Sequence, residues 1–237
     1  MKNKNKNNDI VIEVKNLKKT YKVGKVITPV LKGISLKIYK GEFVGIMGPS
    51  GSGKSTLLHQ IALLDNENEG EIIIENKLVN NLNEEESGEF RLNKLGYVFQ
   101  EYRNIPELTS IENVYLPLKM QGILGLEEYK KIAKDLLIEV GMGERLNHLP
   151  SELSGGQQQR VAIARALATK PLILFADEPT ASLDVGSGDI ILKLFSRFNK
   201  EYNQTIVMVT HEPEQIKYFD RVIYIKDGLI EKEVNKK

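Results

Sequence analysis

The chain has 237 residues, of which 41% are hydrophobic, 33 are Lys or Arg and 32 are Asp or Glu, and it has no cysteine. A chain of this length can bury a substantial core as one compact domain. The net charge of +1 gives no electrostatic argument for a nucleic-acid partner, and the lack of cysteine excludes disulfides and thiolate zinc sites. No apolar run approaches the roughly 20 residues that a membrane-spanning helix needs.

The N-terminal part of the chain differs from the rest in its pattern. Residues 1–9 are rich in Lys and Asn without an apolar stretch, which predicts a disordered tail and excludes a secretory signal. Residues 10–14 and 30–39 alternate apolar and polar side chains, and residues 71–75 lead into a turn. Alternation with period two is typical of half-buried strands, so we expect an N-terminal antiparallel β subdomain.

Short, continuous apolar runs recur through the remaining chain. They are residues 43–47, 97–99, 172–176, 206–209 and 222–225. Such runs are typical of parallel strands covered on both faces, which predicts an α/β fold with a mostly parallel sheet. Between about residues 101 and 160 the spacing becomes helical, as at Ile132, Leu136 and Val140, with Gly141 as a C-terminal cap. We therefore predict one domain over residues 10–235, with an inserted helical subdomain.

A glycine-rich segment joins the first apolar run to a helical pattern. Its residues are Gly48, Pro49, Ser50, Gly51, Ser52, Gly53, Lys54, Ser55 and Thr56. This strand, loop and helix context is that of a phosphate-binding P-loop, in which backbone N–H groups and the helix dipole face an anion. Lys54 would place its charge on the β- and γ-phosphates, and the Ser55 hydroxyl would ligate Mg²⁺. The sequence thus predicts a nucleoside triphosphate with Mg²⁺ as the ligand.

Two carboxylates follow the apolar run at residues 172–176. They are Asp177 and Glu178, and ligands of open α/β sheets bind beyond the carboxyl ends of the strands. Beside a nucleotide, Asp177 would hold Mg²⁺ through water, and Glu178 would orient or deprotonate the attacking water. The alternative interpretation is a helix cap or a solvated turn.

A second glycine-rich helix start lies at residues 153–157, Leu-Ser-Gly-Gly-Gln. Ser154 can cap the helix that runs through Val161, Ala164 and Leu167, which makes a second helix terminus suited to phosphate. An ordinary capped helix is the alternative, because Ser-Gly-Gly is common in turns. One γ-phosphate seldom needs two such cradles from one subunit, so the second would serve a neighbouring molecule.

The order of these motifs resembles that of an ATP-binding cassette (ABC) ATPase, over about residues 10–233. The Leu-Ser-Gly-Gly-Gln sequence between the P-loop and residues 172–178 is the most specific part of the resemblance. It implies that the protein hydrolyses ATP, and that two copies associate head to tail as a homodimer with two ATP molecules between them. Dimerisation would then depend on ATP, since the ligand forms part of the interface.

The resemblance also implies residue roles. Tyr21 would stack on adenine, Gln100 would touch Mg²⁺ and the attacking water, and His211 would contact the γ-phosphate. The alternatives are a strand-end tyrosine that packs on the sheet and a structural histidine. The implied catalytic residues are Glu178, His211, Gln100 and Lys54. The implied Mg²⁺ ligands are Ser55, Gln100 and Asp177. The residues implied to act on the ATP of the opposite subunit are Ser154, Gly155, Gly156, Gln157 and Asp184.

Residues 44–58, 96–100 and 108–118 are similar to the lipoprotein-release (LolD-type) and macrolide-export (MacB-type) ATPases. This similarity implies a transport-coupled ATPase at the cytoplasmic face of the cell membrane, bound peripherally to a permease-like integral membrane subunit that exports or extracts a substrate. The alternative is a cell-division (FtsE-type) ATPase, which transmits force without transport. A binding module without activity is disfavoured because Glu178 and His211 are intact.

The permease subunit would need a docking surface on this chain. Apolar and aromatic residues after Gln100 are typical of interface anchors and predict a groove for a short cytoplasmic helix. They are Tyr102, Ile105, Pro106, Leu108 and Ile111. The alternative is that these residues pack the helical insertion.

Overall fold

The computed structural model describes residues 9–65 and 69–236 of the chain, so the predicted tail at residues 1–9 lies outside it except for Asp9. The described residues divide into two compact units. Unit 1 comprises residues 9–65, 69–87 and 198–236, and unit 2 is Gly88–Arg197. In the sequence, the boundaries of the two units fall within helices α2 (Glu84–Lys94) and α6 (Val185–Tyr202).

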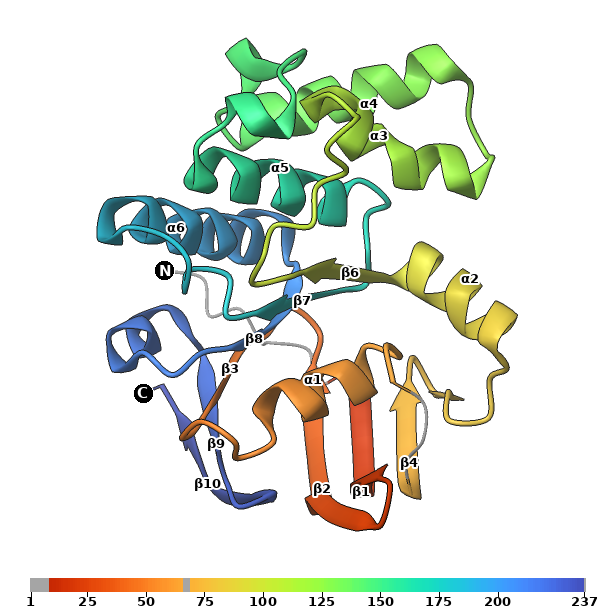
Figure 1. The fold of residues 1–237 in the computed structure, drawn as a ribbon, viewed down its shortest axis with the longest axis vertical. Coiled ribbons are helices and arrows are strands. Elements are labelled where there is room, and N and C mark those ends of the chain that lie inside the picture. The colour runs from red at the N-terminus through yellow and green to blue at the C-terminus, as the bar shows by residue number, and fades with distance from the viewer. Residues whose placement is uncertain (1–8, 66–68, 237) are drawn as a thin grey trace. The chain divides into compact units, whose positions relative to one another are not determined.

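Unit 1 contains the predicted antiparallel sheet, in the order β2-β1-β4-β5. Strands β1 (Ile10–Val23) and β2 (Val26–Tyr39) form a long hairpin (Figure 1), β4 (Glu69–Ile74) pairs with β1, and β5 (Lys77–Leu78) pairs with β4. The hairpin is longer than the alternating pattern predicts. Its tip carries exposed residues such as Val23 and Val26, because backbone pairing continues where side-chain burial has ended.

The second sheet of unit 1 is built on β3 (Phe43–Met47), all of whose residues are buried. Strands β8 (Thr205–Val209) and β9 (Arg221–Lys226) flank β3 in parallel, and β10 (Leu229–Asn235) pairs antiparallel with β9. Helix α1 (Lys54–Ile61) contacts β2 and β8, and a 3₁₀ helix spans Pro213–Tyr218. The continuous apolar runs therefore form buried parallel strands, as predicted.

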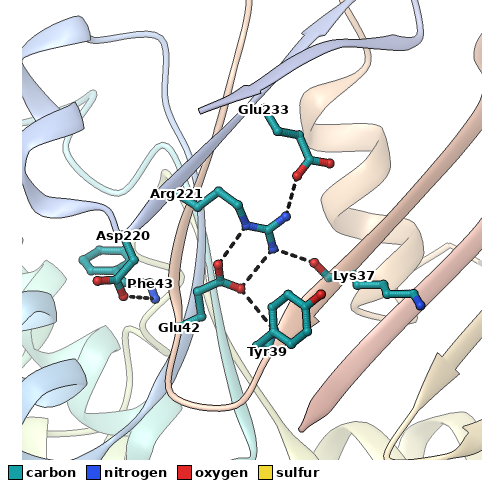
Figure 2. Close-up of polar contacts among 7 residues, drawn as sticks. All are labelled: Lys37, Tyr39, Glu42, Phe43, Asp220, Arg221 and Glu233. Carbon is teal, nitrogen blue, oxygen red and sulfur yellow. Dashed lines mark hydrogen bonds and ion pairs between the residues drawn. The ribbon is translucent and has the colours of Figure 1, made fainter. Parts of the chain in front are cut away.

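A buried ionic cluster joins four segments of unit 1 around Arg221 (Figure 2). The Arg221 guanidinium donates to both carboxylate oxygens of Glu42, at 2.8 and 3.0 Å, and to Glu233 at 2.6 Å. It also donates to the backbone carbonyl of Lys37, while Glu42 accepts from the Tyr39 N–H. Burial opposes the charge of Arg221, but the two carboxylates outweigh it and raise the pKa of Arg221. Sequence patterns gave no sign of this cluster, because its members are far apart in the chain.

Unit 2 combines a parallel strand pair with a group of helices. Strand β6 (Leu95–Val98) pairs with β7 (Ile173–Asp177), and helices α3 (Ser110–Gln121), α4 (Leu126–Glu139) and α5 (Gly155–Leu167) pack against one another (Figure 1). Short 3₁₀ helices lie at Gly143–Arg145 and Pro150–Glu152. Helix α4 matches the predicted helical spacing, and Gly141, with φ of 73°, follows its end as a left-handed residue.

Candidate active site

The glycine-rich loop of unit 1 leads into α1 without a side-chain cap. Gly53, the N-cap residue, has φ of 99°, a left-handed conformation that favours glycine. Lys54 is 6% exposed and folds back over the loop, where its Nζ donates to the Pro49 carbonyl at 3.0 Å. The Ser52 hydroxyl is buried and has no hydrogen-bond partner among the described residues. The loop thus gathers an ammonium group and an unsatisfied hydroxyl at a helix N-terminus, which is suited to an anion.

His211 leaves the same edge of the sheet as this loop. Strands β3 and β8 are parallel with Ile46 opposite Val209, and the Thr210 N–H donates to the Ile46 carbonyl at 3.1 Å. Gly48 and His211 each follow their paired residue by two positions, so both emerge at the carboxyl ends of neighbouring strands. His211 is exposed there. Unit 1 therefore places His211, which is predicted to contact the γ-phosphate, at the same edge of the sheet as the glycine-rich loop.

Tyr21 lies near the tip of β1 and is 38% exposed. Its hydroxyl donates to Asp65 Oδ2 at 2.8 Å and lies beside the Thr56 side chain, in the first turn of α1. The ring of Tyr21 is thereby held beside the helix that begins at the glycine-rich loop. Its predicted contact with adenine stays a prediction.

The strand pair of unit 2 repeats the arrangement seen in unit 1. Val98 of β6 pairs with Ala176 of β7, so Gln100 and Glu178 both lie two residues beyond paired positions, at one sheet edge. Gln100 is exposed, and Glu178 has φ of 43°, which is uncommon for a residue other than glycine. Asp177 is half-buried, next to the Tyr97 hydroxyl at 3.5 Å. Burial, followed by the charge of Asp177, raises the pKa of Tyr97.

Helix α5 begins at Ser154, as predicted. Its hydroxyl accepts from the Gln157 N–H at 3.4 Å, and the Gln157 side chain accepts from the Ser154 N–H at 2.9 Å, which completes a capping box. Glycine is required next because a Cβ at Gly155 would lie 2.5 Å from the Tyr102 hydroxyl. A Cβ at Gly156 would lie 2.9 Å from the Ser187 hydroxyl. The helix start is therefore self-capped and closely covered by its own unit.

Asp184, which is predicted to act on the ATP of the opposite subunit, caps helix α6. Its Oδ1 accepts from the Ser187 N–H at 2.9 Å, and the hydrogen bonds from Ser187 lower the pKa of Asp184. Val185, the next residue, is 91% exposed. The segment is thus held in a fixed conformation with an apolar side chain directed to solvent.

Sequence reasoning missed two residues of α5 that hold the loops beyond β6 and β7. Gln159 is fully buried, and its Nε2 donates to the carbonyls of Pro179 at 2.7 Å and Phe99 at 3.3 Å. Arg165 donates to the carbonyls of Tyr102 and Arg103, and burial lowers its pKa to about 10. Gln159 therefore bridges the neighbours of Gln100 and Glu178. The sequence signal that could have revealed Gln159 is the presence of a polar residue on the otherwise apolar face of α5.

The predicted docking segment packs largely on unit 2 itself. Asn113 of α3 is fully buried, and its side chain bonds the backbone of Ile105 and the carbonyl of Leu108. Tyr102 is half-buried, whereas Pro106 is exposed. A shallow apolar hollow of about 240 Å³ lies instead over α2, β6, α3 and α5, with Leu92, Leu116, Pro117 and Met120 in its lining.

The sequence model of the ABC transporter family matches residues 31–181 of the chain. The chain belongs to the ABC transporter family. An ABC transporter ATP-binding protein of Methanocaldococcus jannaschii, MJ0796, is 49% identical over 226 residues, which cover 94% of this chain and 96% of that protein. Its dimeric structure in a post-hydrolysis state, bound to ADP and Pi, matches with a TM-score of 0.88 at 47% identity, over 94% and 98% of the two chains.

Two further ABC relatives bear on the subtype. The lipoprotein-releasing ATP-binding protein LolD of Aquifex aeolicus is 46% identical over 226 residues, covering 95% of this chain and 98% of LolD. The macrolide export ATP-binding/permease protein MacB of Syntrophobacter fumaroxidans is 43% identical over 224 residues, covering 94% of this chain and 31% of MacB. The predicted P-loop α/β fold, family and ATP-hydrolysing activity are therefore confirmed: this is the ATP-binding subunit of an ABC transporter. Among the described residues, no helix has the length and apolar character to cross a membrane.

Proposed function

We propose that this ABC subunit couples ATP-driven closure of a homodimer to a membrane permease of the LolD/MacB-associated type, for export or extraction of a substrate. The match to LolD over almost its whole length carries this proposal. MacB is an ATP-binding/permease protein, and this chain corresponds to less than a third of it. The chain would act at the cytoplasmic face of the membrane. The relatives are named for lipoprotein release and macrolide export, so they do not favour the alternative of an FtsE-type ATPase that transmits force without transport.

In this proposal, residues 48–56 bind the triphosphate of ATP. The unsatisfied Ser52 hydroxyl and the buried Lys54 ammonium support the assignment, since buried polar groups require partners and a phosphate supplies them. Lys54 would exchange its bond to the Pro49 carbonyl for the β- and γ-phosphates. Tyr21, beside Thr56, would stack on the adenine.

The candidate ligands for Mg²⁺ suit that ion chemically. Ser55 offers a hydroxyl oxygen, Asp177 a carboxylate and Gln100 an amide oxygen, all of them hard ligands. The described residues contain no group of three or more His, Cys, Asp or Glu side chains that could enclose a metal. The small number of protein ligands in the candidate set agrees with an ion held by one carboxylate, substrate phosphates and water. When bound, Mg²⁺ would neutralise charge on the phosphates.

Glu178 would orient or deprotonate the attacking water, with Gln100 and His211 contacting the water and the γ-phosphate. The left-handed backbone at Glu178 supports a functional role, since such conformations concentrate at active sites. Glu178→Gln should keep ATP binding and lower the hydrolysis rate by about 10²- to 10⁴-fold, because shape is retained and the base is lost. Size exclusion with light scattering should detect an ATP-stabilised dimer. Hydrolysis at the wild-type rate would assign the chemistry to another residue.

Ser154, Gly155, Gly156, Gln157 and Asp184 would act on the ATP bound to the partner subunit. The dimeric structure of MJ0796, bound to ADP and Pi, supports the association of two copies that this role requires. Mixing Lys54→Ala subunits with Ser154→Arg subunits should restore one complete site per heterodimer, and hence ATPase activity that neither variant has alone. The control mixes Lys54→Ala subunits with the double variant, which cannot form a complete site. Equal activity in the two mixtures would contradict the head-to-tail arrangement.

The hollow lined by Leu92, Leu116, Pro117 and Met120 would receive a short cytoplasmic helix of the permease. Met120 is 65% exposed in this apolar setting, as expected of an interface anchor. Tyr102 is a poor test position, because its hydroxyl lies against Gly155. Met120→Glu should retain ATPase activity and lose the permease on purification from detergent-solubilised native membranes. Ile138→Glu, at an exposed site on α4, is the matched control and should retain it. Retention by both variants would place docking elsewhere.

A further inference from the structure

Three side chains of unit 1 form a closed polar network around Tyr21. Lys19 Nζ donates to Asp65 Oδ1 at 2.6 Å, and the Tyr21 hydroxyl donates to Asp65 Oδ2 at 2.8 Å. Lys19 and Tyr21 lie two residues apart on β1 and therefore on one face of the sheet. Both oxygens of one carboxylate are thus committed, each to a different side chain of the same strand.

Lys19 also covers one face of the Tyr21 ring. Its Nζ lies over the ring at 5.0 Å from the centroid, within the range of a cation–π interaction. The Lys19 side chain is only 3% exposed, although lysine is rarely buried to this extent. Tyr21 itself remains 38% exposed. Because the ammonium occupies one face, the ring is open to a stacking partner on its other face.

The network keeps one protonation state around neutral pH. Burial, followed by the hydrogen bond to Asp65, raises the pKa of Tyr21. Burial opposes ionisation of Asp65, but hydrogen bonds from Lys19 and Tyr21 outweigh it and leave the pKa of Asp65 below its ordinary value. The hydroxyl therefore stays a donor and the carboxylate stays an acceptor.

The network is tied to the phosphate-binding loop. The Thr56 side chain lies beside the Tyr21 hydroxyl, and Thr56 is in the first turn of α1, two residues after Lys54. A ring fixed at its hydroxyl by Asp65 and covered on one face by Lys19 has little freedom to swing about β1. Stacking on a preorganised ring loses less conformational entropy than stacking on a mobile one.

We propose that Asp65 and Lys19 are positioning residues for the base of the nucleotide. Asp65 fixes the Tyr21 ring through its hydroxyl, and Lys19 fills one face so that the base stacks only on the other. This inference rests on the stacking role of Tyr21 proposed above. It assigns no contact between the nucleotide and either positioning residue.

The test compares two ligands that share phosphates and differ in the base, ADP and inorganic pyrophosphate, by calorimetry on the full chain with Mg²⁺. Tyr21→Ala should raise the Kd for ADP by about 5- to 150-fold, the range for loss of one stacked base. Asp65→Asn and Tyr21→Phe should each raise it by about threefold or more, since they keep the ring and break its anchor. The double variant Tyr21→Phe/Asp65→Asn should weaken ADP binding by less than the product of the two single effects, because both substitutions act on the same Tyr21–Asp65 hydrogen bond. The Kd for pyrophosphate should stay unchanged throughout.

Glu69→Gln is the matched control, because Glu69 pairs with the neighbouring Lys18 at 3.3 Å on the exposed surface and should not affect ADP binding. Equal weakening of ADP and pyrophosphate by Asp65→Asn would overturn the inference, since the loop itself would have changed. Unchanged ADP binding in Asp65→Asn with weakened binding in Tyr21→Ala would overturn it while leaving the stacking role intact. Unchanged ADP binding in Tyr21→Ala would overturn the stacking role as well.

Discussion

Helices α1 and α5 both begin in glycine-rich sequence, yet their first turns are completed in different ways. The N-cap of α1 is Gly53, which offers no side chain, whereas Ser154 closes a capping box with Gln157 at the start of α5. A helix start without a cap needs an external partner for its N–H groups, and a capped one does not. We infer that the first turn of α1 is completed by a bound ligand, whereas the first turn of α5 is completed by side chains of the protein itself.

The glycines of the two segments also differ in purpose. Gly51 and Gly53 adopt left-handed conformations, and a Cβ at Gly51 would meet open space. Gly155 lies within a regular helix, and a Cβ there would clash with the Tyr102 hydroxyl. In the first loop glycine is needed for its backbone freedom. In the second it is needed for its lack of a side chain.

The largest expected effect tests α1 as the ligand-completed helix. Lys54→Ala should abolish tight ATP binding and slow hydrolysis, because removal of one preorganised electrostatic group costs about 3–4 kcal/mol in enzymes. Nucleotide titration and steady-state ATPase assays measure this. Lys193→Ala, at an exposed lysine of α6, should bind and hydrolyse ATP normally. Undiminished ATP binding by Lys54→Ala would contradict the interpretation of α1 as a helix completed by a bound nucleotide.

The next effect tests α5 as a helix whose polar groups serve its own unit. Gln159→Leu leaves two carbonyls without their donor and should cost about 1–3 kcal/mol of unfolding free energy. Because those carbonyls neighbour Gln100 and Glu178, kcat should fall at nearly unchanged KM. Gln158→Leu is the control, since among the described residues its side chain bonds the Leu153 carbonyl alone. A change in KM with constant kcat would contradict this role.

A smaller effect separates the two uses of glycine. Gly155→Ala should destabilise the protein by about 1–3 kcal/mol through overpacking against Tyr102. Tyr102→Phe removes the clashing hydroxyl and should restore part of that loss in the double variant. Gly51→Ala should cost about 1–2 kcal/mol through backbone strain alone. Denaturant unfolding of the four variants measures these terms, and failure of Tyr102→Phe to rescue would refute the steric explanation.

The smallest effect concerns the cap itself. Ser154→Ala and Thr109→Ala each remove one capping box, at α5 and α3, and each should cost about 1 kcal/mol of stability. If α5 presents a functional surface, only Ser154→Ala should also lower ATPase activity, measured at saturating ATP. Equal ATPase activity in the two variants would show that the cap of α5 has a structural role alone.

The sequence by itself determined the buried parallel strands, the order of the motifs and the cap at Ser154, because periodic burial and capping act between residues close in the chain. It predicted the candidate site residues but not the side chains that hold them. The Arg221 cluster, the bridge made by Gln159 and the pairing of Asp65 with Lys19 and Tyr21 were decided by tertiary structure alone. Each includes a contact between groups at least 20 residues apart, so its geometry depends on strand register and helix packing, which no local pattern encodes.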